Sequence, residues 1–101
     1  MEKRKPHYAL TRIKELIRQG ACRITRTALS DAAHDFGYIQ SEQLLNVVLL
    51  LDAADFYKSM TTHHDKTLWQ DVYRPMIGSV QGYVKVQIVD KSTVVISFKQ
   101  R

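Results

Sequence analysis

The sequence predicts an α+β fold in which N-terminal helices pack on a C-terminal antiparallel sheet. Apolar residues recur at helical spacing up to about residue 51, and after Asp55 the pattern changes to strand-like alternation. Helices first and strands afterwards are typical of this class. With 101 residues there is room for one hydrophobic core, so we expect a single domain spanning residues 1–101.

Two helices are predicted before residue 40. The first covers residues 8–19, with Pro6 shortly before its N-terminus and Gly20 placed to end it. Residues 23–25 form a short strand or a connector, and Thr25 or Thr27 then caps the second helix, which ends at Gly37. The expected buried positions are Leu10, Ile13, Leu16 and Ile17 in the first helix, and Ala28, Leu29, Ala32, Ala33 and Phe36 in the second.

A third helix begins at Ser41, which is a good N-cap, with Glu42 placed against the positive end of the helix dipole. Its apolar residues lie nearly all round the helix, which predicts a central core helix covered on most sides. These residues are Leu44, Leu45, Val47, Val48, Leu49, Leu50 and Leu51.

Four strands follow, with a histidine-containing turn after the first and a loop at residues 78–82 after the second. The strand ranges are 57–62, 68–74, 83–89 and 93–99. Alternation in the last two fixes a hairpin register, because a slip by one residue would turn an apolar set into water. We expect residue 84 opposite 98, 86 opposite 96 and 88 opposite 94, with a three-residue loop at 90–92. A second register with a longer loop keeps the faces matched but pairs the strands less completely.

This register places Tyr83 opposite Lys99 on the face away from the core, with Lys85 and Ser97 as the next rung. Opposed side chains have β-carbons roughly 5 Å apart. A phenol beside an ammonium on a polar sheet face forms a plausible phosphate site.

Charge is distributed unevenly along the chain. The net charge is +5, made of +6 over residues 1–26, −5 over 27–55 and +4 over 56–101. A polyanion such as nucleic acid would meet the two ends, although an ordinary soluble basic protein fits the same numbers. The longest apolar run, residues 47–51, is far short of a membrane span, and Cys22 alone forms no internal disulfide. We therefore expect a cytoplasmic protein without membrane contact.

Residues 56–75 hold the densest polar chemistry, with cations, hydroxyls and two histidines among three large aromatics. His63, His64 and Asp65 lack the spacing of a metal site, and no glycine-rich phosphate loop is present, so no metal or cofactor is expected. Metal-free RNA cleavage remains possible, because it needs a base, an acid and cations around the phosphate. From the residues alone, the candidates are as compatible with solvated sheet positions as with catalysis. They are Lys58, Gln70, Tyr83 and Lys99.

Four sequence blocks, MEKRKPH, DFYKSMTT, LWQDVYRP and VISFK, resemble the MqsR family of toxins from bacterial type II toxin–antitoxin modules. The resemblance implies a RelE-like fold and an endonuclease that cuts single-stranded messenger RNA at short GC-containing sites without the ribosome. It also implies a cognate antitoxin that joins a zinc-binding half to a DNA-binding helix-turn-helix half.

Residue by residue, the resemblance implies catalytic roles for Lys58, Gln70, Tyr83 and Lys99. We expect Tyr83 to act as acid or base, Lys58 and Lys99 to stabilise the phosphate, and Gln70 to orient the substrate. Tyr57 and Arg74 are expected to contact a base or a phosphate. Two alternatives stay open, namely a non-catalytic nucleic-acid-binding regulator and a nuclease of the same fold that needs the ribosome.

Overall fold

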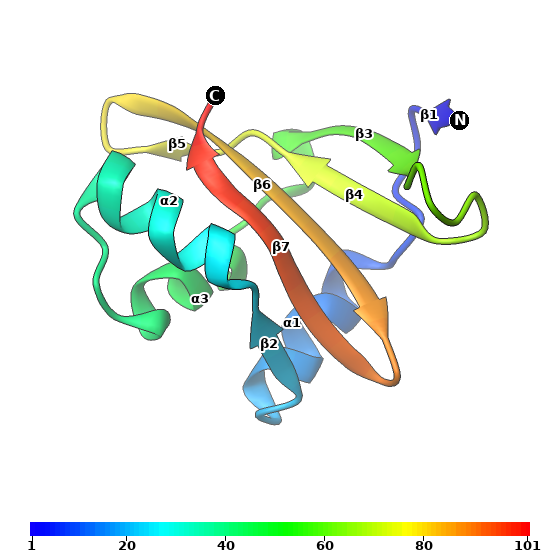
Figure 1. Ribbon diagram of the computed structural model, residues 1–101, viewed down its shortest axis with the longest axis horizontal. Coiled ribbons are helices and arrows are strands. Elements are labelled where there is room, and N and C mark those ends of the chain that lie inside the picture. Colours follow the sequence, from blue (N-terminus) through cyan, green and yellow to red (C-terminus); the bar gives the residue numbers. More distant parts are fainter.

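Helices occupy the first half of the chain and strands most of the second, which confirms the predicted α+β class. The computed structural model describes residues 1–101, and Figure 1 shows the helices gathered on one side of a long, twisted sheet. The helices are α1 (Leu10–Arg18), α2 (Arg26–Phe36), α3 (Ser41–Leu49) and the short 3₁₀ turn η1 (Ala53–Asp55). The strands are β1 (Glu2–Lys3), β2 (Cys22–Ile24), β3 (Phe56–Thr61), β4 (Trp69–Tyr73), β5 (Met76–Ile77), β6 (Val80–Val89) and β7 (Ser92–Gln100).

Helices α1 and α2 form where the apolar pattern places them. The predicted stripe of α1 is confirmed, with Ile13, Leu16 and Ile17 buried. The Thr25 side chain accepts a hydrogen bond from the Ala28 N–H and so caps α2, which ends at Gly37 in the left-handed conformation. No helix is long and apolar enough to cross a membrane.

The predicted burial is wrong for parts of α2 and α3. Leu29 is 37% exposed and Ala33 is exposed, because only one stripe of α2 reaches β7. Helix α3 buries only Leu44 and Val48, whereas Leu50, the residue after its last turn, is 82% exposed. An all-round apolar helix therefore does not lie at the centre here, and its N-cap is Gln40, since Ser41 is already helical.

The sheet orders its strands β1-β3-β4-β6-β7-β2, with β5 paired to β6 outside this path. Every pair is antiparallel except β2 with β7. Of the two possibilities for residues 23–25, a short strand or a connector, the structure has the strand, which lies one residue earlier as β2. The two-residue strands β1 and β5 were not predicted. The predicted loop at 78–82 is also wrong in part, since β6 already begins at Val80.

The β6–β7 register agrees with the prediction at one end of the hairpin and differs at the other. Tyr83 pairs with Lys99 and Val84 with Phe98, as expected, but Val86 pairs with Val95. The turn holds only Asp90 and Lys91, both with positive φ, and such two-residue turns match the twist of a hairpin. A bulge beside Lys85 absorbs the extra residue of β7. The expected pairs 86–96 and 88–94 and the three-residue loop are therefore wrong.

The bulge changes which residues of β7 face the helices. Val95 and Phe98 join the core, whereas Val94 is buried outside that cluster. The remaining core positions come from all three helices and from β4 and β6, with Leu51 after α3. They are Ile13, Ile17, Ala28, Ala32, Leu44, Val48, Leu51, Tyr73, Val84 and Val86.

Candidate active site on the open sheet face

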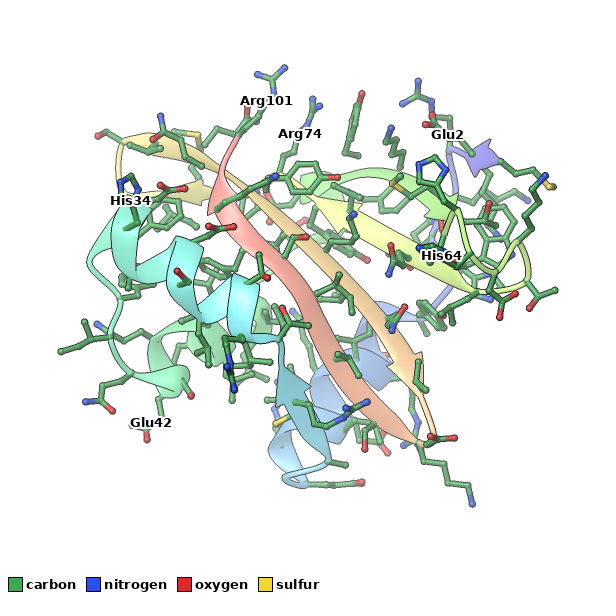
Figure 2. All side chains as sticks on the ribbon, in the orientation of Figure 1. Glu2, His34, Glu42, His64, Arg74 and Arg101 are labelled. Atoms are coloured by element: carbon green, nitrogen blue, oxygen red, sulfur yellow. The ribbon has the colours of Figure 1, made fainter.

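One face of the sheet packs on the helices, and the other face of strands β3, β4, β6 and β7 is free of helices; we call it the open face. Core residues such as Tyr73, Val84 and Phe98 mark the covered side, so their neighbours along each strand point the other way. Figure 2 shows Arg74 extending away from the helices, with Glu42 on the helical side. The open face carries Tyr57, Lys58, Gln70, Val72, Arg74, Tyr83, Lys85, Gln87, Ser97 and Lys99.

Tyr83 and the two predicted phosphate-binding lysines gather on this face from three different strands. The Lys99 Nζ lies 5.3 Å from the centre of the Tyr83 ring, as expected of opposed residues in β6 and β7. Lys58 in β3 reaches the same region across β4, since it pairs with Val72, which pairs with Lys85. The fold thus brings the phenol of Tyr83 together with cations that lie 25 residues before it and 16 residues after it in the chain.

Gln70 lies one rung further along and is only 8% exposed. Its Nε2 donates a hydrogen bond of 3.1 Å to Oε1 of Gln87, so its amide orientation is set by a neighbour in the sheet. Gln70 therefore belongs to the floor of the open face, where it can hold a group that comes down onto the sheet but cannot reach far out.

Tyr57 and Arg74 form a second cluster beside the lysines. A bulge in β3 between Phe56 and Lys58 leaves Tyr57 without a β4 partner, and the Arg74 guanidinium carbon lies 3.3 Å from the centre of its ring. Arg4 and Lys58 also approach this ring, each at 5.5 Å. The Arg74 charge, supported by Lys58 and Arg4, lowers the pKa of the Tyr57 phenol.

Two more charged residues lie beside the predicted lysines, namely Lys85, which the predicted register placed on the rung next to Tyr83 and Lys99, and Glu2. Lys85 is half-buried between the other lysines, and burial, followed by the charges of Lys99 and Lys58, lowers its pKa. Glu2 reaches the face from the N-terminal strand, where its Oε2 accepts a hydrogen bond of 2.8 Å from Lys58 Nζ. Alternation in β6 was a usable signal for Lys85, but nothing in the sequence pairs Glu2 with Lys58.

The N-terminal arm that carries Glu2 is anchored by Asp71. This side chain is fully buried on the covered side and accepts hydrogen bonds of 2.9–3.0 Å from the backbone N–H groups of His7 and Tyr8. The Met1 amino group also donates to Thr61 Oγ1 at 3.0 Å. The position of Glu2 is therefore set by tertiary contacts, and the pKa of its carboxyl is lowered chiefly by the hydrogen bond from Lys58.

Other polar or aromatic residues of the 56–75 stretch lie away from this site. His63 and His64 are exposed in the turn between β3 and β4. Tyr73 is 1% exposed, and burial raises its pKa to about 12. No three His, Cys, Asp or Glu side chains gather as metal ligands would.

The largest cavity is elsewhere too. It measures about 400 Å³, is mainly apolar, and holds none of the predicted site residues. It is lined by Tyr38, Val47, Leu50, Asp55, Pro75, Met76, Ile77 and Gly78.

The geometry is that of a basic surface on an open sheet, which suits a polyanion. Lys85 and Lys99 flank the Tyr83 ring, and Lys58 lies across β4 on the same face. Strands β3, β4, β6 and β7 contribute no carboxylate to this face, and the surface is extended instead of enclosed.

Comparison with known proteins narrows this class. The family described as "Motility quorum-sensing regulator, toxin of MqsA" matches residues 5–100. The chain is also 43% identical over 101 residues to the mRNA interferase toxin MqsR of Escherichia coli (strain K12), covering the whole of both chains. The chain therefore belongs to the MqsR toxin family, and its class is that of an endoribonuclease toxin.

Proposed function

We propose that this chain is the toxin of a type II toxin–antitoxin module and cleaves single-stranded messenger RNA in the cytoplasm. We further propose that cleavage needs neither a metal ion nor the ribosome and occurs at short GC-containing sites. The observation that supports this most directly is the position of Tyr83 among Lys58, Lys85 and Lys99 on a face open to an extended ligand. Single-stranded RNA can lie along such a face with its bases splayed out.

The chemistry is transfer of the phosphate to the neighbouring 2′-oxygen. A base removes the 2′-OH proton, the 2′-oxygen attacks phosphorus, and the bond to the 5′-oxygen breaks as an acid protonates that oxygen. The products are a 2′,3′-cyclic phosphate and a free 5′-OH. The proton taken from the 2′-OH is balanced by the proton given to the 5′-oxygen, and the P–O bond that forms replaces the P–O bond that breaks, so no oxidant, reductant or cofactor enters.

We assign four residues to roles in this reaction. Tyr83 is placed to act as acid or base, because its phenol lies on the open face beside two of the lysines that would hold the phosphate. Lys58 and Lys99 would stabilise the negative charge that builds on the phosphate oxygens. Gln70, held by Gln87, would orient the nucleotide from the floor of the face.

Tyr57 and Arg74 extend the face beyond the reacting phosphate. The guanidinium covers the Tyr57 ring at 3.3 Å and keeps a positive charge beside a flat aromatic surface. This pair suits the neighbouring nucleotide, either through its phosphate or through stacking of its base.

The partner expected for a toxin of this family is a cognate antitoxin, which we propose carries a zinc-binding half and a helix-turn-helix half. Its zinc would belong to the antitoxin. The neighbouring reading frame tests this directly, because it should encode both the zinc ligands and the helix-turn-helix.

The central experiment compares Lys58→Ala, Gln70→Ala, Tyr83→Phe and Lys99→Ala with the wild type on a GC-containing single-stranded RNA in EDTA. We expect cleavage to a 2′,3′-cyclic phosphate, with Tyr83→Phe slower by roughly 10²–10⁴-fold because acid–base catalysis contributes about that much. Each variant should also relieve growth arrest in cells while still binding the antitoxin. Lys91→Ala, in the exposed hairpin turn, is the matched control and should cut normally.

Three outcomes would contradict parts of the proposal. Full toxicity in all four variants would remove the assigned site. A gel shift with intact RNA would favour a non-catalytic binder, which the same basic face would support. Cleavage seen only with translating ribosomes would favour a ribosome-dependent nuclease.

A further inference from the structure

Lys85 lies at the centre of the open face. Its strand, β6, runs between β4 and β7, and its rung contains Lys58, Val72, Lys85 and Ser97 in that order across four strands. Adjacent strands lie about 4.8 Å apart, so the backbones of Lys58 and Lys85 are separated by roughly 10 Å with an apolar valine between them. The Lys85 Nζ also lies 5.9 Å from the centre of the Tyr83 ring.

The charge of Lys85 has no counter-ion. Lys58 pairs with Glu2, whereas Lys85 makes no ion pair and no side-chain hydrogen bond. The Lys85 side chain is half-buried. The charged groups that face it from the neighbouring strands are Lys58 and Lys99, and the phenol of Tyr83 lies beside it on its own strand. An uncompensated, partly desolvated ammonium beside like charges destabilises the folded chain. Such an arrangement indicates that an anion completes the site when the protein works.

An ordinary surface role fits Lys85 less well. A lysine can lay its methylene stem over an apolar neighbour such as Val72 and hold its ammonium in water. Two β-bulges, however, flank this rung, one in β3 beside Lys58 and one beside Lys85 itself. Bulges re-aim side chains next to active sites, and here they turn two strands around the rung that carries both lysines.

We propose that Lys85 is a further catalytic residue, whose ammonium contacts a non-bridging oxygen of the scissile phosphate between Lys58 and Lys99. This inference rests on the proposed ribonuclease function. In it, Lys85 stabilises the charge that develops as the 2′-oxygen attacks, and it moves no proton. The absence of a carboxylate partner then has a reason, since the phosphate is the partner.

The kinetic test compares wild type, Lys85→Met, Lys85→Arg and the control Lys91→Met on one single-stranded RNA. Methionine keeps the unbranched stem of the side chain and removes its ammonium group. We expect kcat of Lys85→Met to fall by roughly 10²–10³-fold, the usual effect of removing one donor to a developing oxyanion. KM should change much less than kcat, Lys85→Arg should recover part of kcat, and Lys91→Met should behave as the wild type.

A stability measurement separates this role from a structural one. Because the pKa of Lys85 is lowered in the folded state, the unfolded chain binds the proton more tightly, and wild-type stability should rise with pH towards the ordinary lysine pKa of 10.5. Lys85→Met lacks the destabilising charge, so its urea midpoint should equal or exceed that of the wild type at pH 7. The difference between the two midpoints should shrink at higher pH.

The outcomes are distinct from those that test the proposed function. If the wild type fails to cut RNA, the proposed function itself is wrong. If the wild type cuts and Lys85→Met cuts as fast, only the role of Lys85 is wrong. A fall of the urea midpoint that accompanies the fall of kcat in Lys85→Met would assign Lys85 to structure and would also overturn the inference.

Discussion

The two faces of the sheet are built from the same strands but serve different ends. On the covered face Phe98 and Val84 are fully buried among helix side chains, whereas their strand neighbours Lys99 and Tyr83 belong to the open face. Burial of the first set supplies the hydrophobic stabilisation of the fold. The second set concentrates like charges, which opposes it. Stability and the proposed function are therefore divided between alternate residues of one hairpin.

The division can be tested most strongly at Phe98 and Lys99, which are consecutive in β7. Phe98→Ala should lower the free energy of unfolding by about 3–5 kcal/mol, because it empties a fully buried position. Lys99→Ala should change it by less than about 0.5 kcal/mol, as is usual for an exposed position. Urea unfolding of both variants measures the difference. A large loss of stability in Lys99→Ala would show that the open face also holds the fold together.

A smaller effect on stability is expected at Asp71. Apart from Glu2 in the N-terminal arm, it is the only acidic residue in the strands of the sheet. Asp71→Asn should lower the free energy of unfolding by about 2 kcal/mol, since a buried carboxylate loses charge-assisted hydrogen bonds to the N–H groups of His7 and Tyr8. Amide exchange at these two residues should speed up. Asp31→Asn on α2 is the control, and equal exchange in both variants would contradict the anchoring role.

The smallest effect concerns Glu2, the carboxylate that the arm brings to the open face. Glu2→Gln in a Tyr83→Phe background should bind single-stranded RNA roughly two- to fivefold more tightly than Tyr83→Phe alone. The reason is that the Glu2 carboxylate, whose ion pair with Lys58 is weak, no longer competes with the phosphate for this lysine. Filter binding gives the Kd, with Glu42→Gln on α3 as the control. Unchanged or weaker binding would mean that Glu2 positions Lys58 and does not oppose the ligand.

Much of this arrangement was predictable from residues alone. The helix stripe of α1, the stop at Gly37 and the Tyr83–Lys99 pair all follow from local patterns that the fold respects. The predicted register of the β6–β7 hairpin is wrong where two local rules compete. Alternation favoured a three-residue loop, but a two-residue turn with positive φ at Asp90 and Lys91 matched the strand twist better, and a bulge took up the difference.

The predicted burial of helix α3 is wrong for a different reason. Its apolar residues exceed what the core can cover, so Leu50 stays exposed, and composition cannot say which side of a helix lacks a partner. Burial depends on what packs against a residue.

The amino-acid pattern alone yields the fold class, one face for the core and the identities of the polar residues opposite it, because side-chain period and polarity are properties of the local chain. The folded chain was needed to place Lys85 between Lys58 and Lys99, to turn Tyr57 towards Arg74 and to bring Glu2 onto Lys58. Two of these contacts, Lys58 with Lys85 and Glu2 with Lys58, join strands that are distant in sequence, and bulges and a buried anchor set the positions of these strands. A local pattern can pair the two strands of one hairpin, as it does for Tyr83 and Lys99, but it does not say which hairpins lie side by side.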